Sequence, residues 1–102
     1  MQMDPKTETL VSIVRVFNKR VRNGRTQDTI VEHMSGEVVE LKEEIEKDKL
    51  GLAPGSDGIV GENLDIIACA LDSIFEHAPE ITDEQLNRIL ITKCEKWERK
   101  YG

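Results

Sequence analysis

The segment from Ile59 to Glu76 constrains the fold more than any other part of this 102-residue chain. Drawn as an α-helix it is apolar around most of its circumference, so we expect it to be buried centrally or at a subunit interface. It also carries Glu62, Asp65 and Asp72 at spacings of three and seven, which places them on one line along a helix. Burying a carboxylate is costly unless a proton, a cation or hydrogen bonds neutralise it. The segment therefore predicts a buried helix that carries a polar site, with the role of Asp72 left open.

A second pair of acids, Glu37 and Glu40, lies in the preceding predicted helix, and 21 residues separate Glu40 from Glu62. In each pair the acids are three apart, so their Cβ atoms lie about 5–6 Å apart on one helix face. Antiparallel packing of the two helices can gather both pairs in one small volume, which then needs a cation. The acids offer only oxygen ligands, and no His or Cys repeats beside them, which favours Mg²⁺, with Mn²⁺ as a substitute. The absence of any Glu-x-x-His motif disfavours a di-iron centre. The predicted metal ligands are Glu37, Glu40, Glu62 and Asp65.

Three further helices are predicted around this segment. The first runs from about residue 6 to 22, the second from a Thr26 cap to the glycine-rich loop 51–58, and the fourth from a Thr82 capping box to about Lys100. On the second helix a 3-4 apolar pattern predicts a core seam, and the glutamates form a stripe about 40° to one side of it. The residues of this seam are Val31, Met34, Val38, Leu41 and Ile45.

Length and composition favour a single all-α domain over residues 1–102. Four aromatic residues leave an aliphatic core, and oligomerisation would supply the missing burial. A net charge of −6 argues against general binding to nucleic acids. The polar N-terminus and the lack of a long apolar run predict a cytoplasmic protein without a membrane segment. Cys69 and Cys94 are expected to be reduced, packed thiols, and Gly36 is expected to allow close approach of another helix or a ligand.

The run Met34 to Leu41, Met-Ser-Gly-Glu-Val-Val-Glu-Leu, followed by Glu62-x-x-Asp65 on the next helix, resembles the signature of the MazG-like all-α nucleoside triphosphate pyrophosphohydrolases. In helix order the resemblance covers about residues 8 to 100. It implies a four-helix bundle assembled as a homodimer or homotetramer, with Mg²⁺ held by the four acids. It also implies cleavage of an NTP or dNTP between the α- and β-phosphates, giving a nucleoside monophosphate and pyrophosphate.

The resemblance suggests roles for further residues. Glu40 is the candidate for orienting the attacking water, and Lys93 and Lys96 are candidates for balancing charge on the leaving pyrophosphate. Arg15, Lys19 or Arg20 could act on phosphates from the first helix, although a basic helix face is commonly just solvated. The first helix lacks the tryptophan and histidine that several relatives place near the base, which leaves Phe17 and Asn18 as candidate base contacts.

The main alternative is a non-catalytic interaction or assembly protein derived from the same fold. In that case the apolar helix at 59–76 serves only assembly, and the acids form a solvated helix face.

Overall fold

The computed structural model describes residues 8–21 and 24–102 of the chain. Over these ranges it contains no strand and four helices, α1 (Leu10–Arg20), α2 (Gln27–Lys49), α3 (Gly58–His77) and α4 (Asp83–Tyr101). The predicted all-α class is confirmed, and α2, α3 and α4 begin and end within about one residue of their predicted bounds. None of the four helices is long and apolar enough to cross a membrane.

The predicted first helix is longer than the observed α1. The Oγ1 of Thr9 accepts a hydrogen bond from the backbone N–H of Ser12 at 3.0 Å, and the Oγ of Ser12 accepts one from the N–H of Thr9 at 2.8 Å. This capping box starts the helix at Leu10, so residues 8 and 9 are not helical. The predicted helical positions 6, 7 and 22 lie outside the described residues.

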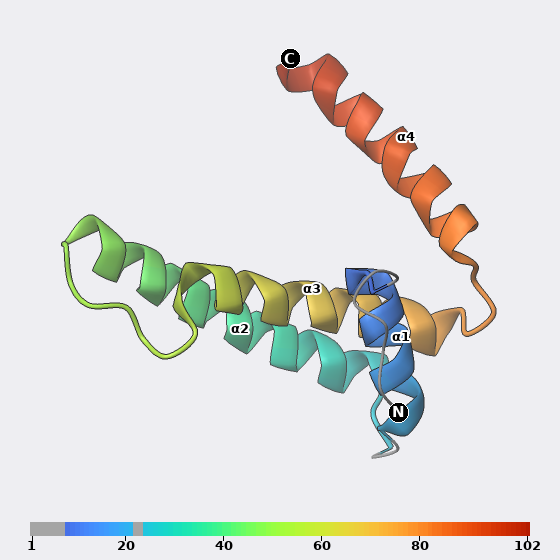
Figure 1. Ribbon diagram of the computed structural model, residues 1–102, viewed down its shortest axis with the longest axis horizontal. Helices are drawn as coiled ribbons and strands as arrows, with labels where there is room; N and C mark the ends of the chain where they lie inside the picture. The colour runs from blue at the N-terminus through green and yellow to red at the C-terminus, as the bar shows by residue number, and fades with distance from the viewer. Residues whose placement is uncertain (1–7, 22–23) are drawn as a thin grey trace.

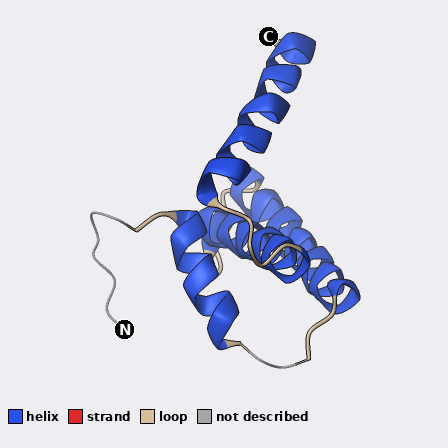
Figure 2. Ribbon diagram, turned by 90° about the vertical axis from the view of Figure 1, so that its right-hand side faces the viewer, coloured by secondary structure: helices blue, strands red, loops and turns tan. Residues whose placement is uncertain are grey.

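The helices α2 and α3 run side by side in opposite directions and form a hairpin, and α1 packs across α3 (Figure 1). The fourth helix follows the C-terminal end of α3 and projects away from the other three helices, as Figures 1 and 2 both show. The chain by itself therefore does not bring α4 alongside α2 and α3. A four-helix bundle completed by other copies stays a prediction.

The predicted core seam of α2 is only partly correct. Val31 and Val38 are 48% and 41% exposed, whereas Ile30 and Glu44 are buried. The helix is thus turned by about 40°, less than one residue, relative to the expected seam, so that Met34 and Leu41 stay half-buried while the row that contains Glu37 and Glu44 faces α3. The rotation brings the glutamates inward and leaves one apolar flank of α2 outside.

The loop between α2 and α3 is tied to the hairpin by Glu44. The backbone N–H of Gly55 donates to the two carboxylate oxygens of Glu44 at 2.8 and 3.2 Å, and Lys47 lies 3.5 Å from the same carboxylate. A Cβ atom at position 55 would lie 2.3 Å from Glu44 Oε1, so glycine is needed for this approach. The buried carboxylate of Glu44 therefore has a structural role.

Two smaller expectations do not agree with the structure. A Cβ atom at Gly36 would have no atom of the described chain within 4 Å, so none of the described helices approaches there, and close approach of a ligand stays a prediction. Cys94 is exposed on α4, while Cys69 is half-buried in α3 as expected. Burial and the nearby carboxylates raise the pKa of the Cys69 thiol, which keeps it protonated and unreactive.

Candidate metal centre

The two acid pairs meet where α2 and α3 pack against each other. One carboxylate oxygen from each of Glu37, Glu40 and Glu62 lies within 4.8 Å of the others. A second group with the same spacing consists of Asp57, Glu62 and Asp65. The four predicted ligands are therefore brought together, but in two overlapping groups that share Glu62. We call the five residues of both groups the acidic site.

Glu62 is the centre of the acidic site. Only 6% of this residue is exposed, and its Oε2 atom has no hydrogen-bond partner among the described residues. The Oε2 atom of Glu37 is likewise buried without a partner. Glu40 and Asp57 are exposed, so the site has a buried floor and an open rim. Buried oxygens without a partner are uncommon in folded proteins, and a cation is one of the groups that can satisfy them.

Asp57 is not among the ligands that the sequence predicts. This residue precedes α3 at its N-cap position, but its side chain makes no capping hydrogen bond. A Cβ atom at Gly61 would lie 2.8 Å from Asp57 Cβ, so the glycine makes room for the Asp57 side chain near Glu62. The signal in the sequence was an aspartate one residue before a helix and five before Glu62, which resembles an ordinary helix cap.

The electrostatics of the acidic site disfavour full ionisation. Burial, followed by the neighbouring Glu40 carboxylate, raises the pKa of Glu62 to about 7. The pKa of Glu37 is also raised, mainly by burial and then by Glu40, and its hydrogen bond with His33 opposes this shift. Near neutral pH the site therefore holds a proton unless a cation takes its place.

The metal-free protein is expected to lose stability as the pH rises from about 4.5 to about 7. The pKa of Glu62 is about 7 in the folded protein and 4.5 ordinarily, so the folded state holds the proton more tightly than the unfolded state. The stabilisation that this proton gives to the folded state is complete below about pH 4.5 and is lost by about pH 7. Thermal melts in EDTA should show a melting temperature that falls between about pH 5 and pH 8, and Glu62→Gln should flatten this decline. An equal decline in both proteins would contradict the assigned burial of Glu62.

His33 and Asp72 lie beside the acidic site without joining it. The Nε2 atom of His33 lies 3.0 Å from Glu37 Oε1, and the His33 side chain is 68% exposed. Asp72 accepts a hydrogen bond from Asn18 at 2.8 Å and pairs with Arg25. Because a cationic side chain already neutralises it, Asp72 has a structural explanation that needs no metal.

A hollow of about 540 Å³ lies between α1, α2 and α3. It includes His33 and Cys69, each one helical turn from Glu37 and Asp65 respectively, so it adjoins the acidic site. Its lining is mostly aliphatic and aromatic, and it includes Phe17. This volume and lining are typical of a site for a small molecule with an apolar part.

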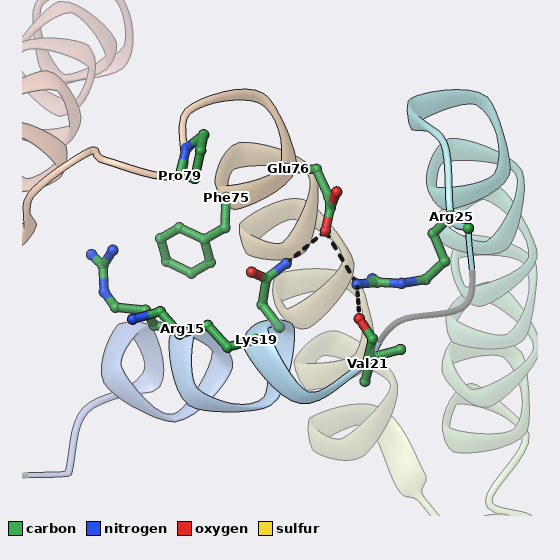
Figure 3. Close-up of a pocket in the computed structure, with 9 residues that line it drawn as sticks. Arg15, Lys19, Val21, Arg25, Phe75, Glu76 and Pro79 are labelled. Atoms are coloured by element: carbon green, nitrogen blue, oxygen red, sulfur yellow. Dashed lines mark hydrogen bonds and ion pairs between the residues drawn. The ribbon is translucent and has the colours of Figure 1, made fainter.

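A second, smaller hollow of about 350 Å³ lies between α1 and the end of α3 (Figure 3). Three cationic side chains line it, but Arg25 bonds Glu76 at 3.2 Å and Arg15 donates to the backbone carbonyl of Ile81 at 3.0 Å. Lys19 makes no ion pair with any described carboxylate. Most of the positive charge is therefore used in structural contacts, with Arg15 joining α1 to the start of α4 and Arg25 joining the α1–α2 connection to α3.

The remaining predicted site residues lie apart from the acids of the same chain. Lys93 and Lys96 are exposed on α4, which projects away from the hairpin (Figure 1). The guanidinium group of Arg20 lies 5.1 Å from the centroid of the Phe17 ring, at the exposed end of α1. The two candidate base contacts, Phe17 and Asn18, both line the hollow beside the acidic site.

Comparisons of the chain with protein-family models, with curated proteins and with solved structures found no match, so its function has to be inferred from the residues themselves.

Proposed function

We propose that this protein is a Mg²⁺-dependent nucleoside triphosphate pyrophosphohydrolase. The observation that supports it most is the buried Glu62 carboxylate. Its Oε2 atom has no hydrogen-bond partner in the described part of the chain, and it lies within 4.8 Å of carboxylate oxygens of Glu37 and Glu40. Such a group is stable near neutral pH only with a proton or a cation. The resemblance of the two acid pairs to the MazG-like signature points to the same function.

The donor atoms fit Mg²⁺. All of them are carboxylate oxygens, and neither group of the acidic site contains His or Cys in the part of the chain that the structure describes. Glu37, Glu40, Glu62 and Asp65 would hold the ion or ions, and Asp57 adds an exposed carboxylate at the rim. When bound there, Mg²⁺ supplies positive charge that offsets the charge on the phosphate oxygens.

The residues of the chain supply the remaining steps. Glu40 is exposed at the rim, where its carboxylate can orient the attacking water and accept its proton. The adjoining hollow would take the nucleoside, with Phe17 against the base and Asn18 as a polar contact. Water adds to the α-phosphorus as the bond to the bridging oxygen breaks, which releases pyrophosphate and a nucleoside monophosphate.

Charge on the leaving pyrophosphate needs cationic side chains near the rim. Lys93, Lys96 and Arg20 are our candidates, and because α4 leaves the hairpin of its own chain, the two lysines would come from a neighbouring copy in a dimer or tetramer. Free nucleotides and Mg²⁺ are both present in the cytoplasm, which we propose as the compartment. No contact with nucleic-acid polymers or membranes is required.

The test is a panel of ribonucleoside and deoxyribonucleoside triphosphates incubated with purified protein and Mg²⁺. Pyrophosphate and monophosphate should appear in equal amounts, and EDTA should abolish both. The panel would also identify the preferred base and sugar. Release of orthophosphate alone, or no release from any nucleotide, would argue against a pyrophosphohydrolase.

The second candidate is a non-catalytic assembly protein. It is favoured by the many large apolar side chains that stay exposed on α2, α3 and α4. It predicts assembly with intact acids but no nucleotide turnover, so the same panel separates the two functions.

A further inference from the structure

His33 is the one described side chain that both lines the hollow of about 540 Å³ and hydrogen-bonds a member of the acidic site. Its Nε2 atom lies 3.0 Å from Oε1 of Glu37, about one helical turn further along α2. Residues four apart lie on the same helix face, so this contact needs no distortion of α2. The histidine therefore lies at the border between the hollow and the acidic site.

The two oxygens of the Glu37 carboxylate have different surroundings. Oε1 accepts a hydrogen bond from His33, whereas Oε2 is buried and has no hydrogen-bond partner among the described residues. The side chain of Glu37 is 14% exposed and that of His33 is 68% exposed, so the histidine bonds the carboxylate from its outer side. The oxygen that stays free is therefore a buried one, and the same is true of Oε2 of Glu62.

The contact differs from an ordinary surface pair on a helix. Arg88 and Glu84 on α4 are also four residues apart and lie 3.0 Å from each other, but both of their side chains are largely exposed. Such a pair can only support its own helix. One oxygen of Glu37, in contrast, lies within 4.8 Å of carboxylate oxygens of Glu40 and Glu62. The group that holds Glu37 in place therefore also holds part of the acidic site in place.

A glutamate benefits from such a partner when it acts as a metal ligand. Its side chain is long and flexible, and the freedom of that side chain is lost when the carboxylate binds an ion. A hydrogen bond to one oxygen restricts the side chain before the ion arrives. Carboxylates that bind metals in proteins are commonly held in this way by a residue that does not touch the ion.

We infer that His33 is a positioning residue for the candidate metal centre, whose Nε2–H donates to Oε1 of Glu37 and so keeps Oε2 of Glu37 in place for a divalent cation. The inference rests on the proposed function only for the presence of the cation, and it requires neither a nucleotide nor turnover. Loss of a partner of this kind typically weakens metal binding by about 10–100-fold. Neither group of the acidic site includes His33, so the histidine acts through Glu37 and not as a ligand.

The test compares two substitutions that each imitate one ring nitrogen of histidine. The side-chain amide nitrogen of glutamine reaches about as far as Nε2, whereas that of asparagine reaches only about as far as Nδ1. His33→Gln can therefore still donate to Glu37, and His33→Asn cannot. The measurement is a calorimetric titration of Mg²⁺ into the full chain without nucleotide, at one fixed pH. The matched control is His77→Asn, which changes an exposed histidine at the end of α3.

His33→Asn is expected to bind Mg²⁺ about 10–100-fold more weakly than the wild type. His33→Gln and His77→Asn should stay close to the wild type. Because His33 is exposed, circular dichroism should show the same helical content in all of these proteins. If His33→Asn loses helical content, it is replaced by His33→Ala, which also lacks the donor and favours a helix.

The outcomes separate this inference from the proposed function. Equal affinity for Mg²⁺ in the asparagine and glutamine variants overturns the positioning role of His33 and leaves the proposed function untouched. Tighter binding by His33→Asn does the same, because the histidine would then compete with the ion for Glu37. A wild type that binds no Mg²⁺ overturns both.

Discussion

Replacing Glu62 with glutamine is expected to lower the release of pyrophosphate by at least about a hundredfold, because a ligand of the catalytic ion is worth several kcal/mol. Glutamine keeps the size of the side chain but removes the charge that both groups of the acidic site share. Binding of Mg²⁺, followed by calorimetry, should weaken together with activity. Both losses have one cause, since no other carboxylate belongs to both groups within the described residues.

Stability separates this effect from simple damage to the fold. Burial raises the pKa of Glu62 to about 7, so the neutral glutamine should leave the metal-free protein as stable as the wild type, or more stable, near pH 8. The matched control is Glu43→Gln, which changes an exposed carboxylate on α2 outside the acidic site. It should keep wild-type turnover. Equal turnover in Glu62→Gln and wild type would mean that the acidic site is not the catalytic centre.

The acid pairs could be predicted because they depend only on helix geometry. Residues three apart share a helix face whatever the tertiary structure. Spacing alone therefore places Glu37 beside Glu40 and Glu62 beside Asp65. That the two pairs also meet follows from a short connection between two long helices, which favours antiparallel neighbours. The sequence therefore predicts both the location and the kind of ligand in the candidate metal centre.

The rotation of α2 could not be predicted in the same way. The apolar seam and the glutamate stripe lie only about 40° apart, and an isolated helix prefers to bury the apolar one. In the structure Glu44 caps the loop through Gly55, and Glu37 faces Glu62 across the interface, so the stripe turns inward. Those contacts involve residues distant in sequence. The apolar periodicity of a single helix does not predict such long-range contacts.

The direction of α4 depends on contacts of the same kind. The capping box at Thr82 predicts where the helix starts, but not where it points. Its direction follows from the bonds that Arg15 makes to Ile81 and Asp83, which join segments more than 60 residues apart in the chain. On sequence alone Arg15 is a candidate phosphate contact or a solvated residue, and no pattern within the first helix indicates its anchoring role.

Replacing Arg25 with methionine is expected to destabilise the fold by about 2–4 kcal/mol, since removing one partner of a partly buried ion pair leaves an uncompensated charge. Arg25 pairs with Asp72 and lies 3.2 Å from Glu76, and the Arg25 and Asp72 side chains are only 21% and 17% exposed. The contact with Asp72 raises the pKa of Arg25, so the guanidinium stays charged. Without it, two neighbouring carboxylates on α3 face α1, and Asn18 is the remaining side-chain donor to them among the described residues. Urea unfolding measures the loss.

An exposed ion pair on α4 provides the control for this prediction. Arg88 and Glu84 lie 3.0 Å apart with side chains 75% and 82% exposed, so Arg88→Met should cost no more than about 1 kcal/mol. A double-mutant cycle with Asp72→Asn then isolates the pair, because the loss caused by Arg25→Met should shrink once Asp72 is neutral. If Arg25→Met costs as little as Arg88→Met, or the loss is unchanged beside Asp72→Asn, Asp72 is not neutralised by Arg25. Asp72 would then be free to act with the acidic site, two turns away along α3.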